Sequence, residues 1–476
     1  MLIIATILVY FVVLFAISRV VGRRGGGATA FFDGGRRSPW YVVAFGMVGA
    51  SISGVTLVSV PGMPLSMGMT YLQTCLGFIV GYFAVAFVLL PVYYRFRLTT
   101  IYSYIGSRLG RLSYKTAASF FVLSKTVGAS VRFFVVCAIM QHYVLAGVGI
   151  PFWCTVVLMV ALIWAYTRRG GIRTLVWTDT FQTFCLFAVV LIIIYEVSCE
   201  LGMSLGDAAT AVAGDARSRI FVFDDPMSRQ YFWKQFISGA FIVIVMTGLD
   251  QDMMQKNLTC KTLREARKDM CTYGFAFVPA NLLLLSLGVL LAMLAEQRGI
   301  GIPATGDALL PMFAASGHLG PVVVVLFAIG MVAASFSSAD SAMTALTTSV
   351  CVDLFERRDD ERLRRRVHGG VAVAFVVLIV AFRAINSTSV IDAIYVLCSY
   401  TYGPLLGLFA FGLFTRRGVR DRLVPYIAVA SPLLCFVIDG VVGATTGYRF
   451  GYELLLLNGA LCFIGLYLSG IRRVRT

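Results

Sequence analysis

Apolar runs of about 20 residues recur along the whole chain, separated by short polar segments, and no other feature limits the fold as strongly. A helix of that length crosses about 30 Å of hydrocarbon. With 59% hydrophobic and 13% charged residues, a water-soluble fold would expose far too much apolar surface. The sequence therefore predicts an all-α integral membrane protein. About thirteen transmembrane helices are expected, at residues 2–20, 40–66, 71–94, 116–147, 150–167, 174–198, 231–254, 271–295, 320–350, 369–386, 390–414, 423–443 and 452–470.

Lysine and arginine concentrate in alternate loops. These basic loops lie near residues 23–37, 95–115, 168–173, 256–268, 357–366, 416–422 and 472–475. Because short cytoplasmic loops collect positive charge, the pattern predicts a plasma membrane protein, such as one of a bacterial inner membrane, with its N-terminus outside and its C-terminus in the cytoplasm. The net charge of +16 is divided among these loops, so it argues against nucleic acid as a partner.

The sequence also supports a prediction for each end of the chain. Residues 1–18 resemble a signal peptide, but Arg19, Arg23 and Arg24 follow the apolar run, so we expect a retained membrane helix. The chain ends about six residues after the last predicted span. We therefore expect no signalling domain there and no obligate protein partner.

A serine-rich face interrupts the apolar segment at residues 331–341. On a helix, Ala334, Ser337, Ser338 and Ser341 lie on one stripe, with Asp340 beside it. Hard cations such as sodium bind to oxygen ligands, and oxygens held inside a membrane are typical of ion sites. The alternative is that the hydroxyls bond to their own helix or allow close helix packing.

Two predicted spans contain residues that break helices. The span at 40–66 holds several glycines and the pair Pro61-Gly62, and the span at 231–254 holds Ser238-Gly239 and Thr247-Gly248. Unwound backbone inside a membrane is tolerated where it lines a cavity, although glycines also permit close helix packing. The two spans are about 190 residues apart and each begins a block of five spans, as expected for an inverted repeat.

The sequence lacks the motifs that are usual for enzymes and for ATP-driven transporters. The three histidines form no cluster with carboxylates, no phosphate-binding loop is present, and the cysteines are scattered as packing residues. We therefore expect no enzyme and no metal other than sodium. Any transport would be driven by an ion gradient.

Several stretches resemble one family. These are residues 166–182, with Gly170-Gly171 and Trp177-Thr178-Asp179, together with residues 247–256, 334–354 and 401–407. In these motifs the chain resembles the sodium:solute symporters, and its site pattern is most similar to that of bacterial sialic acid symporters. The resemblance implies a leucine-transporter-type core of two inverted five-helix repeats, with one extra N-terminal and two extra C-terminal helices. The implied parts are residues 1–39 (extra helix and loop), 40–198 (first repeat), 199–230 (external loop), 231–415 (second repeat) and 416–476 (C-terminal helices).

The resemblance also implies sodium ligands. The main site would use carbonyls of Gly49, Ile52 and Ala334 and the hydroxyls of Ser337 and Ser338. A second site, present in some members, would match Asp179, Ser337, Asp340 and Ser341.

Two acidic residues of that second set leave alternatives open. Asp340 stands where a serine is expected, so it could strengthen cation binding or pair with a base. Asp179 could equally be part of a structural ion pair or a helix cap, and in either case should not face lipid.

Arg132 is the most informative residue for the substrate. An unpaired guanidinium inside a membrane helix is costly, and arginine binds carboxylates through two hydrogen bonds. By resemblance, Arg132 would bind a substrate carboxylate with help from Ser51, Ser53 and Thr56, while Gln73 is a further candidate. The alternative is an internal partner for Arg132. Lys125, nearer the expected cytoplasmic end, is predicted to extend toward the membrane surface.

These observations predict sodium-coupled uptake of a small organic solute by alternating access, with a carboxylate such as sialic acid favoured. Sugar, amino acid and monocarboxylate uptake on the same fold stay open, as does a transporter-like solute sensor. The expected partners are sodium, the solute and the lipid bilayer.

Overall fold

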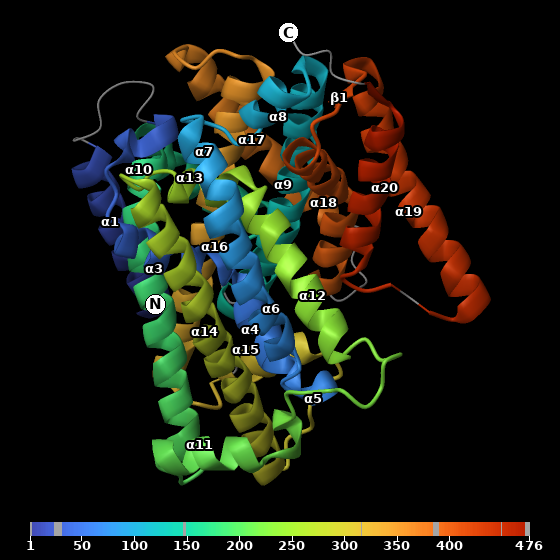
Figure 1. Cartoon of the computed structure of the whole chain (residues 1–476). Helices are drawn as coiled ribbons and strands as arrows, with labels where there is room; N and C mark the ends of the chain where they lie inside the picture. Colours follow the sequence, from blue (N-terminus) through green and yellow to red (C-terminus); the bar gives the residue numbers. More distant parts are fainter. Residues whose placement is uncertain are drawn as a thin grey trace.

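The computed structural model describes residues 2–22, 31–145, 149–315, 317–383, 390–448 and 450–471. Helices running side by side make up nearly all of it (Figure 1). By length and composition, seven described helices can cross a membrane, or nine if each of two sharply bent pairs counts as one span. The prediction of a helical membrane protein is therefore confirmed. The basic residues Arg23, Arg24, Arg449, Arg472, Arg473 and Arg475 lie outside the described residues.

The helices of the first half follow the predicted spans. They are α1 (Leu2–Gly22), α3 (Trp40–Ser51), α4 (Gly54–Gly62), α5 (Pro64–Met67), α6 (Tyr71–Ala84), η2 (Val85–Leu89), α7 (Leu90–Arg95), α8 (Ser103–Arg108), α9 (Arg111–Ile139), η3 (Met140–Val144), α10 (Phe152–Glu200) and α11 (Leu205–Gly214). The predicted spans at 150–167 and 174–198 both lie in α10, which is kinked at Gly171 (φ 55°). A side chain at that position would also collide with the carbonyl oxygen of Phe31.

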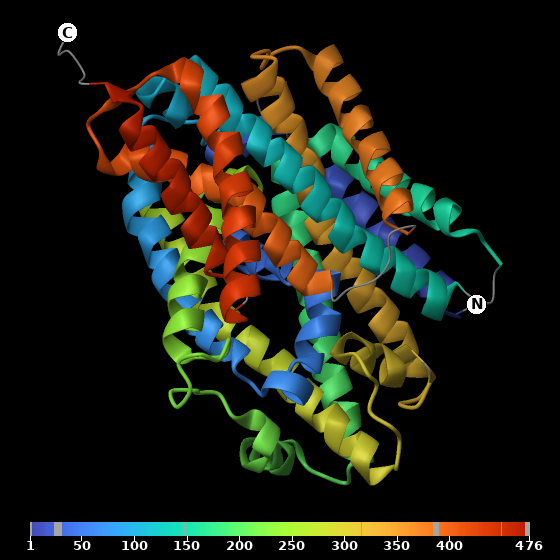
Figure 2. The same cartoon turned by 90° about the vertical axis from the view of Figure 1, so that its right-hand side faces the viewer.

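The second half continues in the same way. Its main helices are α12 (Phe232–Val243), η6 (Ile244–Gly248), α13 (Gln251–Asn257), α14 (Leu263–Gln297), α15 (Leu309–Ala315), α16 (Pro321–Ser349), η8 (Val350–Leu354), α17 (Glu361–Phe382), α18 (Val390–Phe414), α19 (Val424–Thr446) and α20 (Leu454–Leu468). The last three pack on one another at one side of the molecule (Figures 1 and 2). A two-stranded antiparallel ribbon, β1 (Gly418–Val419) and β2 (Gly470–Ile471), joins two loops there and was not predicted.

Both predicted helix breaks are present. The pair α3 and α4 bends by 62°, and the segment from α12 through η6 to α13 bends by 71°. At the first break Ile52 leaves helical geometry, and Ser53 caps α4 by accepting a hydrogen bond from the amide of Thr56. At the second, Asp250 caps α13. Each break therefore leaves carbonyl groups of the preceding helix without helical amide partners.

The glycines near these breaks have separate roles. The second break follows Gly248, whereas Gly239 stays within α12. A Cβ at Gly239 would lie 2.4 Å from the carbonyl oxygen of Thr74, so this glycine permits contact with α6. The expectation of a break at Ser238-Gly239 is wrong, because the glycine there serves close packing.

Three of the basic loops, as far as the structure describes them, meet at one end of the molecule. Arg111 pairs with Glu356 at 3.2 Å, and Lys115 donates to the carbonyl of Asp353 at 2.7 Å. At the same end Arg364 donates to the carbonyl of Arg168 at 3.0 Å. Helix α11 lies across the opposite end (Figure 1). The charge asymmetry predicted along the chain is therefore also an asymmetry between the two ends of the fold.

Candidate functional site

The main cavity lies where the two broken helices meet the long helices α9, α14, α16 and α18. Its polar lining includes Ser51, Ser53, Thr56, Ser124, Lys125, Arg132, Thr247, Asp250, Asp252, Lys256, Tyr273, Ser335, Ser338, Ser341 and Tyr402. The remaining wall is largely aromatic and aliphatic. Polar groups set into an apolar wall are typical of a small-molecule site, and here the polar groups include both cations and carboxylates.

Arg132, on α9, faces this cavity and is partly exposed. Among the residues that the structure describes, its guanidinium forms no ion pair or hydrogen bond. The internal partner considered as the alternative is therefore not found in that part of the chain. A charged group with five donors lines the cavity and is free to bind an anion.

Lys125, two turns before Arg132 on α9, has acidic partners. Its Nζ lies 3.1 Å from an Asp250 oxygen and 2.7 Å from an Asp252 oxygen. Tyr402 on α18 donates to Asp250 at 2.6 Å. The prediction that Lys125 extends to the membrane surface is wrong, because the helix break brings two carboxylates to its buried ammonium.

Four of the five main sodium candidates concentrate at the first break. The Ser338 hydroxyl donates to the carbonyl oxygens of Ala50 at 3.1 Å and Ala334 at 3.3 Å, so it joins α16 to the last turn of α3. Ile52 is the non-helical residue that follows this turn. Gly49 lies against α10, where a Cβ would come within 1.9 Å of the Thr183 hydroxyl. Carbonyls freed at a helix end beside a hydroxyl can coordinate a cation.

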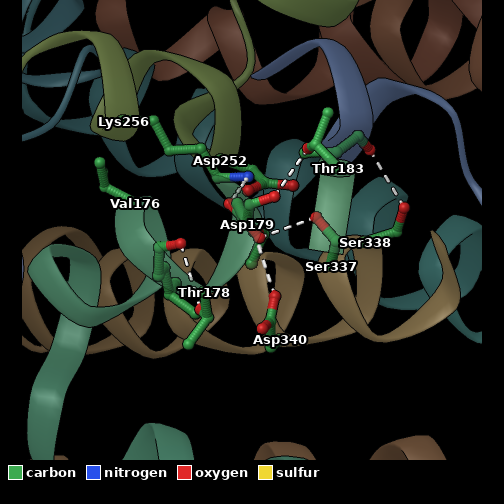
Figure 3. Close-up of polar contacts among 12 residues, drawn as sticks. Val176, Thr178, Asp179, Thr183, Asp252, Lys256, Ser337, Ser338 and Asp340 are labelled. Atoms are coloured by element: carbon green, nitrogen blue, oxygen red, sulfur yellow. Dashed lines mark hydrogen bonds and ion pairs between the residues drawn. The ribbon is translucent and has the colours of Figure 1, made fainter. Parts of the chain in front are cut away.

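Ser337 points instead toward the second candidate set. Its hydroxyl donates to Asp179 at 2.7 Å, and the other Asp179 oxygen lies 2.8 Å from the ammonium of Lys256 on α13 (Figure 3). Asp340 accepts hydrogen bonds from Tyr166 at 2.5 Å and from Ser341 at 3.3 Å. Of the alternatives for Asp179, the structure contains the ion pair. As expected, Asp179 is buried and does not face lipid.

The remaining substrate candidates divide into two groups. Ser51, which hydrogen-bonds with Tyr273 of α14, and the hydroxyls of Ser53 and Thr56, 3.2 Å apart, line the cavity with Arg132. Gln73 does not line it.

The amide of Gln73 is fully engaged elsewhere. It donates to the Gln230 carbonyl at 2.9 Å and accepts from the Val222 amide at 3.1 Å. Gln73 therefore anchors the loop before α12 instead of facing a solute.

Sequence reasoning missed the acidic and basic residues at and after the second helix break. Asp250 and Asp252 stand within a stretch used only for its resemblance, and Lys256 was counted in the basic loop at 256–268. The structure instead buries all three, and charged residues next to an apolar span were a signal for buried pairing. Ala50, Thr183 and Tyr273 carried no comparable signal, since their roles depend on which helices meet.

Comparison with known proteins agrees with this geometry. Residues 31–421 of the chain match the sequence model of the sodium:solute symporter family. This chain belongs to the sodium:solute symporter family. Among its relatives, the human sodium/iodide cotransporter is 22% identical over 82% of this chain and 62% of its own length. The mouse sodium-coupled monocarboxylate transporter 2 is 23% identical over 85% of this chain and 67% of its own length. These relatives are transporters and not enzymes.

A solved structure extends the likeness to the whole fold. The outward-open, substrate-bound structure of a Na+-coupled sialic acid symporter aligns with a TM-score of 0.83 at 17% identity, covering 99% of both chains. At this identity the match shows that the two chains share a fold. The chain spans about three fifths of the sodium/iodide cotransporter's length. The activity of that relative is therefore not transferred to this chain.

Proposed function

We propose that this member of the sodium:solute symporter family imports a small carboxylate together with sodium, by alternating access. The observation that carries the proposal is the unpaired Arg132 guanidinium in the main cavity. Ser51, Ser53 and Thr56 line the same cavity and would bind other polar groups of the solute. An unpaired guanidinium that lines a cavity is stabilised when a carboxylate binds to it, which favours an anionic solute.

The proposed architecture is the family's inverted-repeat core. It comprises about thirteen spans, with repeats at residues 40–198 and 231–415, the extra N-terminal part at 1–39, an external loop at 199–230 and C-terminal helices at 416–476. Support comes from the two bent helix pairs, which stand near the start of each proposed repeat. We place the chain in a bacterial inner membrane with its basic end, including the C-terminus, in the cytoplasm.

Sodium is proposed to bind at the first helix break. Its ligands would be the carbonyls of Gly49, Ile52 and Ala334 with the hydroxyl of Ser338. The hydroxyl of Ser337 would join them by leaving its contact with Asp179. Support comes from Ser338, whose hydroxyl already bridges α16 and the end of α3. Sodium there would favour the conformation in which these helices touch, and a solute with higher affinity for that conformation would be coupled to the ion.

Sialic acid is the first solute to test, because it is the substrate class of the structural neighbour. Uptake of radiolabelled sialic acid into proteoliposomes should require an inward sodium gradient. It should be lost in Arg132→Ala and should need a higher sodium concentration in Ser338→Ala. Uptake that ignores sodium and persists in Ser338→Ala would contradict the sodium site.

A monocarboxylate is the second candidate, because several relatives are sodium-coupled monocarboxylate transporters. Such a solute would use the same Arg132 contact but fewer of the hydroxyls around it. If wild type transports a monocarboxylate and not sialic acid, the carboxylate proposal holds and the sialic acid assignment fails.

A further inference from the structure

A cationic side chain, that of Lys256, lies beside the second predicted sodium set. Asp179 is enclosed between α10, α13 and α16, and its side chain is 1% exposed. One carboxylate oxygen accepts a hydrogen bond from Ser337, and the other is paired with the Lys256 ammonium at 2.8 Å (Figure 3). A positive partner stabilises a buried carboxylate, and Lys256 provides one to Asp179 from within the chain.

The other predicted ligands already have hydrogen-bond partners within the chain. Asp340 accepts hydrogen bonds from Tyr166 and Ser341, and the Ser337 hydroxyl is committed to Asp179. A sodium ion placed among these groups would also lie beside the Lys256 ammonium and be repelled by it. The residues therefore do not fit a second sodium while Lys256 keeps this position.

Lys256 is suited to such a substitution. An ammonium is a compact, single positive charge on a flexible stem, which makes it the side chain most like a monovalent ion. Its side chain is 2% exposed, and Asp179 is its ion-pair partner among the described residues. Lys125 differs, since it bridges two carboxylates of the neighbouring break.

We infer that Lys256 is a tethered cation that takes the place of a second sodium ion at Asp179, so that the chain binds one sodium ion, at the first helix break. This inference rests on the proposed sodium coupling. It identifies Lys256 as the residue that sets the number of ions bound.

The test is equilibrium binding of radioactive sodium to the purified full chain in lipid nanodiscs, counted per protein. The wild type should bind one sodium ion. Lys256→Met, which frees Asp179, should bind two, while Lys256→Arg, which keeps a cation, should bind one. The double variant Asp179→Asn, Lys256→Met should return the count to one, because it removes the carboxylate together with its partner.

Several outcomes would overturn the inference. Two sodium ions on the wild type would show that Lys256 does not replace one, and this measurement stands even if Lys256→Met fails to fold. A folded Lys256→Met that still binds one ion would make the pair merely structural. No sodium binding to the wild type would instead overturn the proposed sodium coupling, and the inference with it.

Discussion

Three cationic side chains line the same cavity, but they are held in different ways. Lys125 and Lys256 each contact buried carboxylates, whereas Arg132, on the same helix as Lys125, has none among the described residues. A paired cation completes a structure that already has its counter-charge. An unpaired cation in a cavity is available to bind an anionic ligand. The comparison therefore separates residues that hold the helices together from the residue proposed to bind the solute.

Removing a paired cation should have the largest effect on stability. Lys125→Met leaves Asp250 and Asp252 buried without their ammonium, so the free energy of unfolding should fall by about 3–5 kcal/mol. Thermal melting of the purified protein measures this loss. Arg132→Met is the matched control and should melt close to wild type. Equal destabilisation by the two variants would show that Arg132 has a structural partner.

Removing the unpaired cation should instead affect binding. Arg132→Gln keeps a polar side chain of moderate length but loses the charge, so the affinity for a carboxylate solute should fall on the order of 100-fold. Solute-dependent thermal shifts measure this change. Arg132→Lys should lose less, because it keeps the charge without the paired geometry. A normal affinity in Arg132→Gln would remove Arg132 from the binding site.

The neutral hydroxyl of Ser338 tests whether sodium binds at a site that does not involve the three cationic side chains. Ser338→Ala removes the hydroxyl that joins α16 to α3, and the sodium affinity should fall by about tenfold. Titration of sodium-dependent stabilisation would give the affinity. Thr344→Ala, which removes a buried hydroxyl further along α16, is the control and should bind sodium normally. Equal losses in both variants would indicate a general effect on the helix.

The smallest expected effect concerns a supporting contact of the Lys125 group. Tyr402→Phe removes one hydrogen bond to Asp250 and leaves the ion pair, so it should cost about 1 kcal/mol of stability. Thermal melting again provides the measurement. The loss should be non-additive with Lys125→Met, because both residues act on the same carboxylate. Strict additivity would show that they act independently.

Much of the fold could be predicted because hydrophobic length and helix breakers act locally. The apolar runs gave the helices, and Gly248 and the glycines of the first break lay close to the observed bends. Ser238-Gly239 carried the same local signal but serves packing on Thr74, which depends on a helix distant in sequence. A glycine that breaks a helix and a glycine that permits close packing look the same in the sequence. Only the neighbouring helix in the fold distinguishes them.

The candidate site was predictable where one helix contains the pattern. The stripe that includes Ser338 follows from helical periodicity, and Arg132 stands out as a charge in an apolar helix. The partners of Lys125 and Lys256 could not be predicted in the same way, because each pair joins residues more than 70 positions apart. Gln73 was misplaced for the same reason, since its partners lie on a distant loop.

The most direct test of the central claim is sodium-driven uptake of a solute panel in proteoliposomes, in which each carboxylate is matched with its neutral amide. Wild type and Arg132→Gln would be compared at equal reconstituted amounts. Wild type should take up a carboxylate and not its amide, and Arg132→Gln should take up neither efficiently. Equal uptake of carboxylate and amide by wild type, or normal carboxylate uptake by Arg132→Gln, would contradict it.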